Sequence, residues 1–444
     1  MAACRRSILD EFRMGAIIDM RLKILVFPCG SEIGLEIHRS LASAKEVVLL
    51  GGSSVSDHGE FVYKSYIPDI PDVSSERFVS EINRVVQKHG VDVIIPAHDS
   101  VILKLAEAAS LGALACKLLT SPYETCIICR SKQKTNTTFS GLIPVPNLYN
   151  SLNSVQEWPV FLKPDVGCGS KGTAKCGSRA EAEYYLSRDP HILIFEYLPG
   201  REYTIDCLTD RYGRLLFCGG RERSRISNGI SVRTLPVEHP AFREMAEIVN
   251  KKLRFQGMWF FQVKENRSGQ LALMEIAPRI AGAMGLYRNL GINFALLSLY
   301  DAAGHDIGLI RNNYPIIFDR ALDSCFRITL EYRHVYVDFD DCIVVKGKLN
   351  LQMVAFLYQC LNRGIGISLL TRYAGNLDAS LKEYRLAQLF DVVINIKDNA
   401  PKSTFIKEPQ SIFIDDSFSE RQEVKSKTDI PVFAPDAVES LLVF

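Results

Sequence analysis

The chain has 444 residues, more than a single hydrophobic core usually spans, so two or three domains are expected. Hydrophobic residues make up 47% of the chain and charged residues 23%, with 52 basic side chains against 51 acidic ones. This balance is typical of a soluble globular protein. It excludes a positive electrostatic potential over the whole surface, which would attract nucleic acid or an anionic membrane. Any anion-binding site must therefore be local.

Residues 1–20 are expected to be an extension that precedes the folded part of the chain. Asp10, Glu11 and Arg13 interrupt its short apolar run, which neither a signal peptide nor a membrane helix tolerates. Folding is therefore predicted to start near Arg21, and no membrane partner is expected.

The cysteines are scattered without the spacing of a disulfide framework, which favours reduced thiols and predicts a cytoplasmic protein. The one CxxC pair, Cys126 and Cys129, has no second pair and no histidine nearby in the sequence. Core packing is expected there rather than zinc binding or redox chemistry.

Residues 21–112 are predicted to form an α/β domain. The apolar run "KILVFP" predicts a strand, followed by a turn with Gly30 and Gly34 and by an amphipathic helix. The runs "EVVLLGGS" and "VDVIIPAHDS" predict further strands. The spacing of the two glycines is too short for the dinucleotide fingerprint, so a packing turn is favoured over a cofactor site.

From residue 113 to about 328 the pattern changes to alternating strands, which predicts an antiparallel α+β region. Its strand segments include "WPVFLKP", "HILIFEYL", "EYTIDCLTD", "RLLFCGG", "GMWFFQVKE" and "QLALMEIAP". Residues 334–444 return to alternating strands and helices, typical of a parallel sheet. Strands are expected at 335–339, 365–371, 391–396 and 411–415, and helices at 350–363 and 377–389.

The phrase "FLKPDVGCGSKGTAKC" places Lys163 at a strand end and a glycine-rich loop behind it. Glycines let backbone N–H groups approach phosphate oxygens, and a strand-held lysine supplies a fixed positive charge. By itself such a loop is more often a plain hairpin. The chain then continues with "EYLPGREYT", a strand with Gln262, and a strand with Glu275 that ends in Pro278-Arg279.

This order of motifs resembles the ATP-grasp superfamily, the fold of carboxylate-amine ligases, over roughly residues 20 to 325. The resemblance implies a pre-ATP-grasp α/β domain at 21–112 and an ATP-grasp domain at 113–328. It implies ATP and Mg²⁺, with Mn²⁺ as a substitute, as cofactors. The implied chemistry activates a carboxylate as an acyl phosphate, which an amine then attacks.

The resemblance also implies a role for each matching residue. Lys132, with Lys134 as a nearby competitor, is the earlier phosphate-binding lysine. Lys163 is implied at the α-phosphate and the adenine side. The other implied ATP contacts are the loop of Gly167, Gly169, Ser170 and Gly172 over the β- and γ-phosphates, Glu196 and Leu198 at the adenine edge, and Glu202 at the ribose.

By the same resemblance, Gln262 and Glu275 hold Mg²⁺ and Arg279 stabilises the transferring phosphoryl group. An unpaired carboxylate in the apolar strand "LALMEIAPR" would be costly, which favours a ligand role for Glu275. One position departs from the family pattern, because Ala277 stands where relatives have asparagine. Alanine cannot bind a metal, so water replaces it and weakens a second metal site, or the ligase activity is reduced or lost.

The stretch "GGRERSRISNGISVR" contains four arginines that could meet an anionic substrate or phosphate. A basic, solvated hairpin explains the same residues equally well. Arg221 and Arg223 are the candidate substrate-binding residues, and Arg225 and Arg233 are the other two.

The segment "VYVDFDDCIVV" places Asp338, Asp340 and Asp341 behind an apolar strand. Carboxylates crowded in this way are tolerable where a divalent cation neutralises them. Because the carboxyl ends of parallel strands share one edge of a sheet, the polar residues behind the later strands are expected at the same place. They are Thr371, Lys402, Asp415 and Asp416.

This second order of motifs resembles the haloacid dehalogenase (HAD) superfamily, mostly phosphatases, over residues 334–444. The resemblance implies that Asp338 is the nucleophile that forms an aspartyl-phosphate and that Asp340 is the acid and base. It implies that Thr371 and Lys402 bind the phosphoryl oxygens. Asp416 would join Asp338 and the main-chain carbonyl of Asp340 at Mg²⁺, with Asp415 or Glu420 in support. The short gaps between the motifs leave no room for a cap domain.

The sequence therefore predicts a bifunctional enzyme, an ADP-forming ligase fused to a Mg²⁺-dependent phosphatase. Its expected partners are a small-molecule carboxylate, an amine and a phosphorylated substrate. No nucleic-acid partner is expected, and both a monomer and a homodimer stay open. Two alternatives stay open. In one, the ATP-binding region has lost its ligase activity and regulates the phosphatase. In the other, the ligase is active and the terminal domain is an interaction module.

Overall fold

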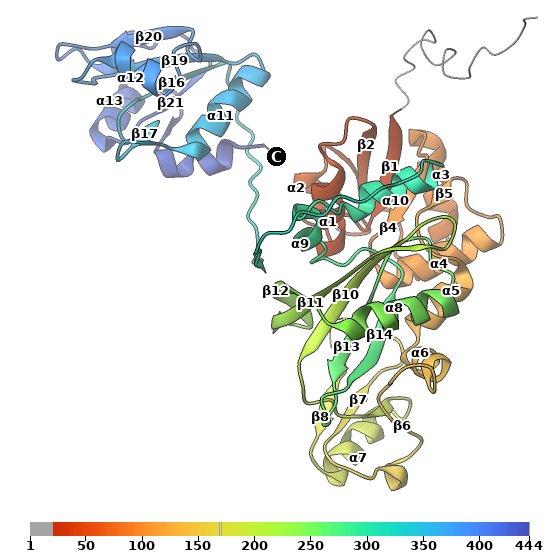
Figure 1. The fold of residues 1–444 in the computed structure, drawn as a ribbon. Coiled ribbons are helices and arrows are strands. Elements are labelled where there is room, and N and C mark those ends of the chain that lie inside the picture. Colours follow the sequence, from red (N-terminus) through yellow and green to blue (C-terminus); the bar gives the residue numbers. More distant parts are fainter. Residues whose placement is uncertain (1–20, 168, 170, 444) are drawn as a thin grey trace, which may run out of the picture. The chain divides into compact units, whose positions relative to one another are not determined.

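A computed structural model of the chain describes residues 21–167, 169 and 171–443 (Figure 1). The chain divides into two compact units, which meet in sequence between Leu322 and Asp323. We call them the first and the second unit. The predicted extension at 1–20 and the predicted loop residue Ser170 lie outside the described residues. In the described part of the chain, no helix is both long and apolar enough to cross a membrane.

The first unit opens with a five-stranded parallel sheet in the order β3-β2-β1-β4-β5. The strand order changes direction beside β1, so the carboxyl ends of β1 and β4 flank the crevice where α/β sheets commonly bind ligands. The elements are β1 (Leu22–Phe27), α1 (Glu32–Leu41), β2 (Val47–Gly52), α2 (Gly59–Val62), β3 (Ser65–Ile67), α3 (Phe78–His89), β4 (Val93–Pro96), α4 (Asp99–Ser110) and β5 (Lys117–Leu118).

The turn between β1 and α1 serves packing, as predicted from its glycine spacing. A Cβ on Gly34 would lie 2.3 Å from the carbonyl oxygen of Cys29, and a Cβ on Gly30 would lie 2.1 Å from the carboxyl carbon of Asp57. Both separations are far below van der Waals contact. The CxxC residues Cys126 and Cys129 are also buried, and burial raises the pKa of both thiols, as expected for core residues.

Two antiparallel sheets complete the first unit, and Figure 1 shows the larger one between the parallel sheet and the smaller one. The small sheet contains β6 (Leu148–Tyr149), β9 (Leu193–Glu196), β7 (Val160–Lys163) and β8 (Ala174–Cys176). The large sheet contains, in spatial order, β14 (Leu271–Ala277), β13 (Gly257–Glu265), β10 (Glu202–Thr209), β11 (Leu215–Ser227), β12 (Ile230–Val237) and β15 (Phe318–Asp319). The helices are α5 (Tyr123–Arg130), α6 (Lys132–Phe139), α7 (Arg179–Arg188), α8 (Pro240–Lys252), α9 (Gly285–Asn289) and α10 (Phe294–Ala302), with a 3₁₀ turn η2 (Leu152–Ser154).

One face of the large sheet packs into a core with α8. Because successive side chains of a strand point to opposite faces, every second residue of β10 and β13 joins this core. The core residues are Tyr203, Ile205 and Cys207 of β10 and Trp259, Phe261 and Val263 of β13. The residues between them, such as Thr204 and Gln262, therefore face the other side.

The second unit is a parallel sheet in the order β20-β19-β16-β21-β22. Its strands are β16 (His334–Val337), β19 (Gly366–Thr371), β20 (Val392–Asn395), β21 (Ser411–Ile414) and β22 (Val432–Phe433), with a hairpin of β17 (Val344–Val345) and β18 (Lys348–Leu349). Its helices are α11 (Leu351–Asn362), α12 (Leu377–Glu383) and α13 (Phe418–Thr428), with 3₁₀ turns η3 (Lys402–Phe405) and η4 (Pro435–Leu441).

The helix predicted at 377–389 is wrong in its second half. Helix α12 ends at Glu383, and Arg385 adopts a φ of 58°, in the left-handed region that stops a helix. The apolar residues Leu386 and Leu389 suggested a longer helix. They do join the hydrophobic core, but they lie in the segment that follows α12.

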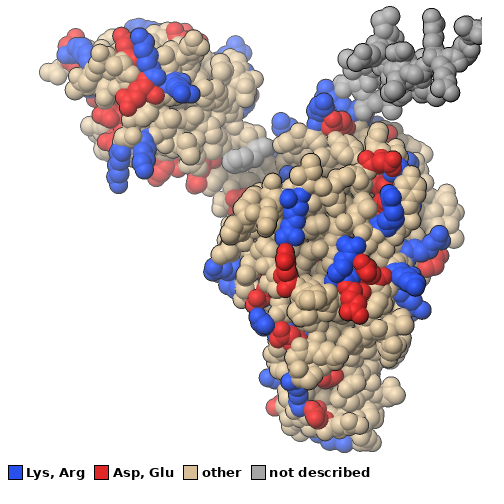
Figure 2. Space-filling model, viewed as in Figure 1, with Lys and Arg blue, Asp and Glu red and all other residues tan. Residues whose placement is uncertain are grey.

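On the face of the molecule shown in Figure 2, acidic and basic side chains of the described residues are interspersed. This agrees with the formal net charge of +1.

The second unit is expected to fold when it is produced alone as residues 323–444, because its two hydrophobic clusters consist of its own residues. Circular dichroism and denaturant unfolding should show one cooperative transition. In this fragment Leu441→Ala should lower the free energy of unfolding by about 2 to 5 kcal/mol, because Leu441 is buried. Val443→Ala is the matched control, since Val443 is exposed. A fragment without a cooperative transition would contradict this prediction.

Candidate active sites

The first unit contains two adjoining cavities on the side of the large sheet away from α8. The inter-sheet cavity, about 180 Å³, lies between the small sheet and the large sheet. The central cavity, about 280 Å³, is lined by the large sheet and by the carboxyl ends of β1 and β4. Lys132, Arg223, Gln262 and Glu275 line both cavities and form what we call the shared wall.

Strand register creates a polar row that crosses four strands of the large sheet. Arg221 of β11 is paired with Thr204 of β10, Thr204 with Gln262 of β13, and Gln262 with Glu275 of β14. Directly paired residues project from the same face of a sheet. The register therefore places the Gln262 amide beside the Glu275 carboxylate, while Ala277 is paired with Phe260 further along.

In the inter-sheet cavity, Lys163 is the buried cation. Its ammonium lies 4.2 Å from the ring centroid of Phe195. Burial lowers the pKa of Lys163 from 10.5 to about 8, although the charges of Glu275 and Glu202 act in the opposite direction. Glu202 lies nearby, in ion pairs of 2.9 Å with Arg223 and 3.5 Å with Lys264.

The glycine loop lies where the two cavities meet. Gly167 and Gly169 line both cavities, and Gly169 and Gly172 have φ of 63° and 71°, which glycine adopts without strain. Lys132 Nζ donates to the carbonyl oxygens of Asp165 (3.3 Å) and Gly167 (3.4 Å). Lys134, its competitor in the sequence, is exposed and is absent from both cavity walls.

The far wall of the inter-sheet cavity contains the two residues predicted to meet adenine. Glu196 and Leu198 both line this cavity, beside Phe195 and Tyr197. The main-chain N–H of Glu196 donates to Asn147 O (2.8 Å), and its side chain accepts from Asn147 N (3.1 Å).

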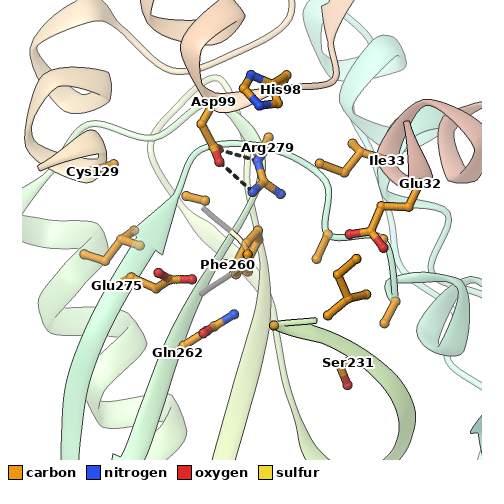
Figure 3. Close-up of a pocket in the computed structure, with 18 of the residues that line it drawn as sticks. Glu32, Ile33, His98, Asp99, Cys129, Ser231, Phe260, Gln262, Glu275 and Arg279 are labelled. Atoms are coloured by element: carbon orange, nitrogen blue, oxygen red, sulfur yellow. Dashed lines mark hydrogen bonds and ion pairs between the residues drawn. The ribbon is translucent and has the colours of Figure 1, made fainter. Parts of the chain in front are cut away.

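In the central cavity, Arg279 is held by a residue that the sequence interpretation missed. Arg279 Nε and Nη2 donate to the two carboxylate oxygens of Asp99 at 2.5 and 3.0 Å (Figure 3). Burial by itself raises the pKa of Asp99, but Arg279 outweighs it and holds this pKa at about 2. The sequence signal was the polar pair His98-Asp99 directly after the apolar strand "VDVIIPA", next to the crevice between β1 and β4.

Arg130 is a second missed residue of the central cavity. Its Nη1 donates to Gly167 O (3.1 Å) and its Nη2 to Ser100 Oγ (3.1 Å), so it connects the glycine loop to α4. The signal was its place just before the predicted Lys132, in "CRSKQK".

The four arginines of β11 and β12 divide into two pairs. Arg221 is 2% exposed and donates twice to Asp206, at 2.7 and 3.2 Å, and Arg223 pairs with Glu202. The other two, Arg225 and Arg233, are exposed. A register shift between Arg223 and Arg225 accounts for this, because it ends the regular alternation of faces. The solvated-hairpin interpretation therefore holds only for the second pair.

In the second unit, a buried lysine joins two carboxylates at the edge of the sheet. Lys402 Nζ lies 2.7 Å from Asp338 Oδ1, behind β16, and 2.6 Å from Asp415 Oδ2, behind β21. Burial raises the pKa of Asp338, opposed by the charge of Lys402 and by hydrogen bonds from Lys402 and Thr371. Burial likewise raises the pKa of Asp415 to about 6. Thr371 is buried at the end of β19.

The remaining acids of this edge are open to solvent. Asp340 and Asp416 are exposed. Partial burial and the charges of Asp341 and Asp416 raise the pKa of Asp340. Among the described residues, no group of three or more His, Cys, Asp or Glu side chains is arranged to hold a metal ion. Metal binding by Asp338, Asp340 and Asp416 therefore stays a prediction.

A family model described as "ATP-grasp in the biosynthetic pathway with Ter operon" matches residues 188–316, which include most of the large sheet. The first unit has an ATP-grasp-like fold. We call it the ATP-grasp unit from here on. The family match ends before the second unit begins. Comparison with the curated proteins found no match.

Solved structures support the same fold for the ATP-grasp unit. The chain is similar to the biotin carboxylase domain of Hydrogenobacter thermophilus 2-oxoglutarate carboxylase in complex with MgADP, ADP and bicarbonate (TM-score 0.56, 14% identity, 67% of this chain and 74% of that chain). It is also similar to an L-amino acid ligase from Bacillus licheniformis (TM-score 0.51, 18% identity, 64% of this chain and 74% of that chain).

A third similar structure is much longer than the matched region. It is pyruvate carboxylase from Rhizobium etli with its activator acetyl coenzyme A (TM-score 0.54, 18% identity). The match covers 65% of this chain but only 29% of that protein. At these identities the likeness concerns the fold.

The lowered pKa of Lys163 predicts a pH-dependent stability. Between pH 8 and 10.5 the unfolded chain binds a proton at Lys163 that the folded chain has lost, so this group makes the free energy of unfolding rise with pH. Lys163→Met should remove that rise in urea unfolding curves across this window. Lys88→Met, at an exposed lysine, is the control and should retain it. Equal pH slopes in wild type and Lys163→Met would show that this pKa is not lowered.

Proposed function

We propose that the protein is a bifunctional enzyme. Its ATP-grasp unit uses ATP and Mg²⁺ to activate a carboxylate as an acyl phosphate for attack by an amine, releasing ADP. Its second unit is a Mg²⁺-dependent, HAD-like phosphatase without a cap domain. The observation that supports the ligase most directly is the shared wall, where cations and oxygen ligands lie between two adjoining cavities.

The inter-sheet cavity has the chemistry of a nucleotide site. Phe195, Leu198 and the main chain around Glu196 offer an apolar slot with polar edges for a base, and Glu202 can accept bonds from ribose hydroxyls. Lys163, Lys132 and the glycine loop supply cations and backbone N–H groups for phosphates. An anionic phosphate would stabilise the protonated form of Lys163, which burial disfavours.

The donor set of Gln262 and Glu275 fits a magnesium ion. One amide oxygen and one carboxylate are hard ligands, and Mg²⁺ commonly completes its shell with phosphate oxygens and water. When bound, the ion neutralises charge on the phosphates. The structure of the 2-oxoglutarate carboxylase domain contains MgADP, which supports ATP and Mg²⁺ for this chain.

In the central cavity, next to the shared wall, two arginines with fixed orientations mark the place where the carboxylate substrate reacts with ATP. Arg279 is oriented by Asp99, and Arg130 links the glycine loop to α4. Both guanidiniums therefore need little reorganisation when negative charge develops on the transferring phosphoryl group. The amine then displaces phosphate from the acyl carbon, which forms the C–N bond and breaks the C–O bond to phosphate.

Glu275→Gln should lower ADP formation by about 100-fold, because it removes the carboxylate of the shared wall. The assay follows ADP from full-length protein with Mg-ATP, a panel of acids and a panel of amines. Glu222→Gln should leave the rate unchanged, since Glu222 is paired with the core residue Tyr203 and lines neither cavity. ADP release that is independent of every acid and amine would argue against ligation.

The phosphatase proposal rests on Asp338 beside Lys402. In it, Asp338 attacks phosphorus and the ester P–O bond breaks, while Asp340 gives its proton to the leaving oxygen. A water activated by Asp340 then attacks the aspartyl-phosphate and releases phosphate. Thr371 and Lys402 contact the phosphoryl oxygens. Asp338, Asp416 and the carbonyl of Asp340 are oxygen donors suited to Mg²⁺, which offsets the charge of the phosphate when bound.

Asp338→Asn should lower phosphate release from a generic phosphoester such as p-nitrophenyl phosphate by more than ~1,000-fold, because it removes the nucleophile. Asp341→Asn is the matched control. Asp341 is exposed and has a φ of 53°, which asparagine also tolerates, so its activity should match wild type. Phosphate release that survives in Asp338→Asn would refute the nucleophile assignment.

Ala277 favours a second candidate function, in which the ATP-grasp unit senses ATP and regulates the phosphatase. Its methyl group lies in the wall of the central cavity and offers no metal ligand. This candidate requires ATP binding without ADP formation, together with a phosphatase rate that changes with ATP. The two assays above separate it from the ligase.

A further inference from the structure

The central cavity has an end that the inter-sheet cavity does not share. It is lined by Glu32 from the first turn of α1, Ser231 from the start of β12, Gly282 and Arg320. Arg320 Nη2 lies 3.0 Å from Glu32 Oε2, and Arg320 Nε donates to the main-chain oxygen of Ser231 at 3.0 Å. The guanidinium of Arg320 therefore contacts the carboxylate of Glu32 with one nitrogen and the main chain of Ser231 with another. Figure 3 shows Glu32 and Ser231 among the side chains around this cavity.

Two polar groups in this part of the cavity wall have no partner within the described residues. They are Ser231 Oγ and Arg221 Nη1, on side chains that are only 5% and 2% exposed. Buried donors are almost always satisfied, because leaving one unpaired is costly. Both residues line the central cavity, so a ligand with an oxygen acceptor can satisfy them there.

Gly282 keeps this end of the cavity open. A Cβ at this position would lie 2.7 Å from Arg320 Nη1 and 3.3 Å from Glu32 Oε1. Any side chain would therefore cover the edges of the guanidinium and the carboxylate that the existing ion pair leaves available.

We propose, building on the ligase function above, that this end of the central cavity binds the amine substrate and that this substrate is an α-amino acid. Its ammonium group faces Glu32. Its carboxylate accepts hydrogen bonds from Ser231 Oγ and from the guanidiniums of Arg320 and Arg221. A simple amine would leave the unpartnered donors unsatisfied, and a second acid would be repelled by Glu32.

Glu32 is also close enough to the reaction centre for its charge to matter there. Burial lowers the pKa of Arg279, but the charge of Asp99 outweighs this effect and raises it. The charge of Glu32 adds a smaller contribution to this rise. An ammonium group held by Glu32 is therefore in the same cavity as the arginine that is proposed to face the transferring phosphoryl group.

The test is isothermal titration of full-length protein with Mg-ADP present, using each standard L-amino acid up to roughly 10 mM. For an amino acid that binds, the decarboxylated amine is titrated in the same way. At least one amino acid should bind, and its amine should bind at least about tenfold more weakly, as expected for lost hydrogen bonds to a charged group. Absence of binding by every amino acid, or equal binding of the amine, would overturn the proposal.

Ser231→Ala and Ser298→Ala provide a matched pair of variants. Both serines are buried with an unpartnered Oγ, but Ser298 lies on α10 and lines neither cavity. Neither change removes a hydrogen bond of the free protein, so the unfolding temperatures should stay close to wild type. Ser231→Ala should weaken amino-acid binding about tenfold and Ser298→Ala should not. Unchanged binding in Ser231→Ala would contradict the proposed contact.

Failure of this inference is distinguishable from failure of the ligase proposal. Binding of an amino acid without ADP formation would leave the subsite intact and remove the ligase. ADP-forming ligation of amines that lack a carboxylate would keep the ligase and remove the amino-acid assignment.

Discussion

The register of the large antiparallel sheet is the constraint on which the candidate ligase site depends. A shift of one residue in the pairing of β13 with β10 would move the core side chains of β13 to the cavity face, so the buried side chains Trp259 and Phe261 determine which face Gln262 occupies. The pairing of β13 with β14 then brings Glu275 beside Gln262. The polar row is a consequence of a core that packs on the other side of the same strands.

Ion pairs complete the site by joining the large sheet and the segments after it to the parallel sheet domain. Asp99 holds Arg279, Glu32 holds Arg320, and the buried Glu36 accepts from Arg288 at 2.8 Å. In the Asp99–Arg279 and Glu36–Arg288 pairs no side chain is more than 23% exposed, so removing one partner would leave a largely uncompensated charge, which is costly. These two pairs therefore favour a single arrangement of the segments that they join. The acids come from the first turns of α1 and α4 and from the second turn of α1. The central cavity is therefore bounded by the ends of a parallel sheet and by one face of an antiparallel one.

In the second unit, the same need to compensate buried charge is met by one lysine. Lys402 comes from a short 3₁₀ turn, η3, yet its Nζ reaches carboxylates behind two neighbouring strands, β16 and β21. Burial disfavours its charge, but the two carboxylates raise its pKa, so Lys402 stays protonated across the physiological range. Asp415 thus makes the buried contact, whereas its neighbour Asp416 is exposed and available to a ligand.

The sequence by itself determined the order of the elements and most of the strands, because apolar periodicity and glycine spacing are local properties. It also indicated Lys132, Lys163, Gln262 and Glu275, which the structure brings to two adjoining cavities, and Asp338 with Lys402, which it brings into contact. Only the tertiary structure could decide that Arg221 and Arg223 point inward while Arg225 and Arg233 do not, because a register shift has no signature in the sequence. It alone showed what Asp99, Arg130, Glu32 and Ser231 contact, because their partners lie far away in the chain and meet them only when the sheets pack together.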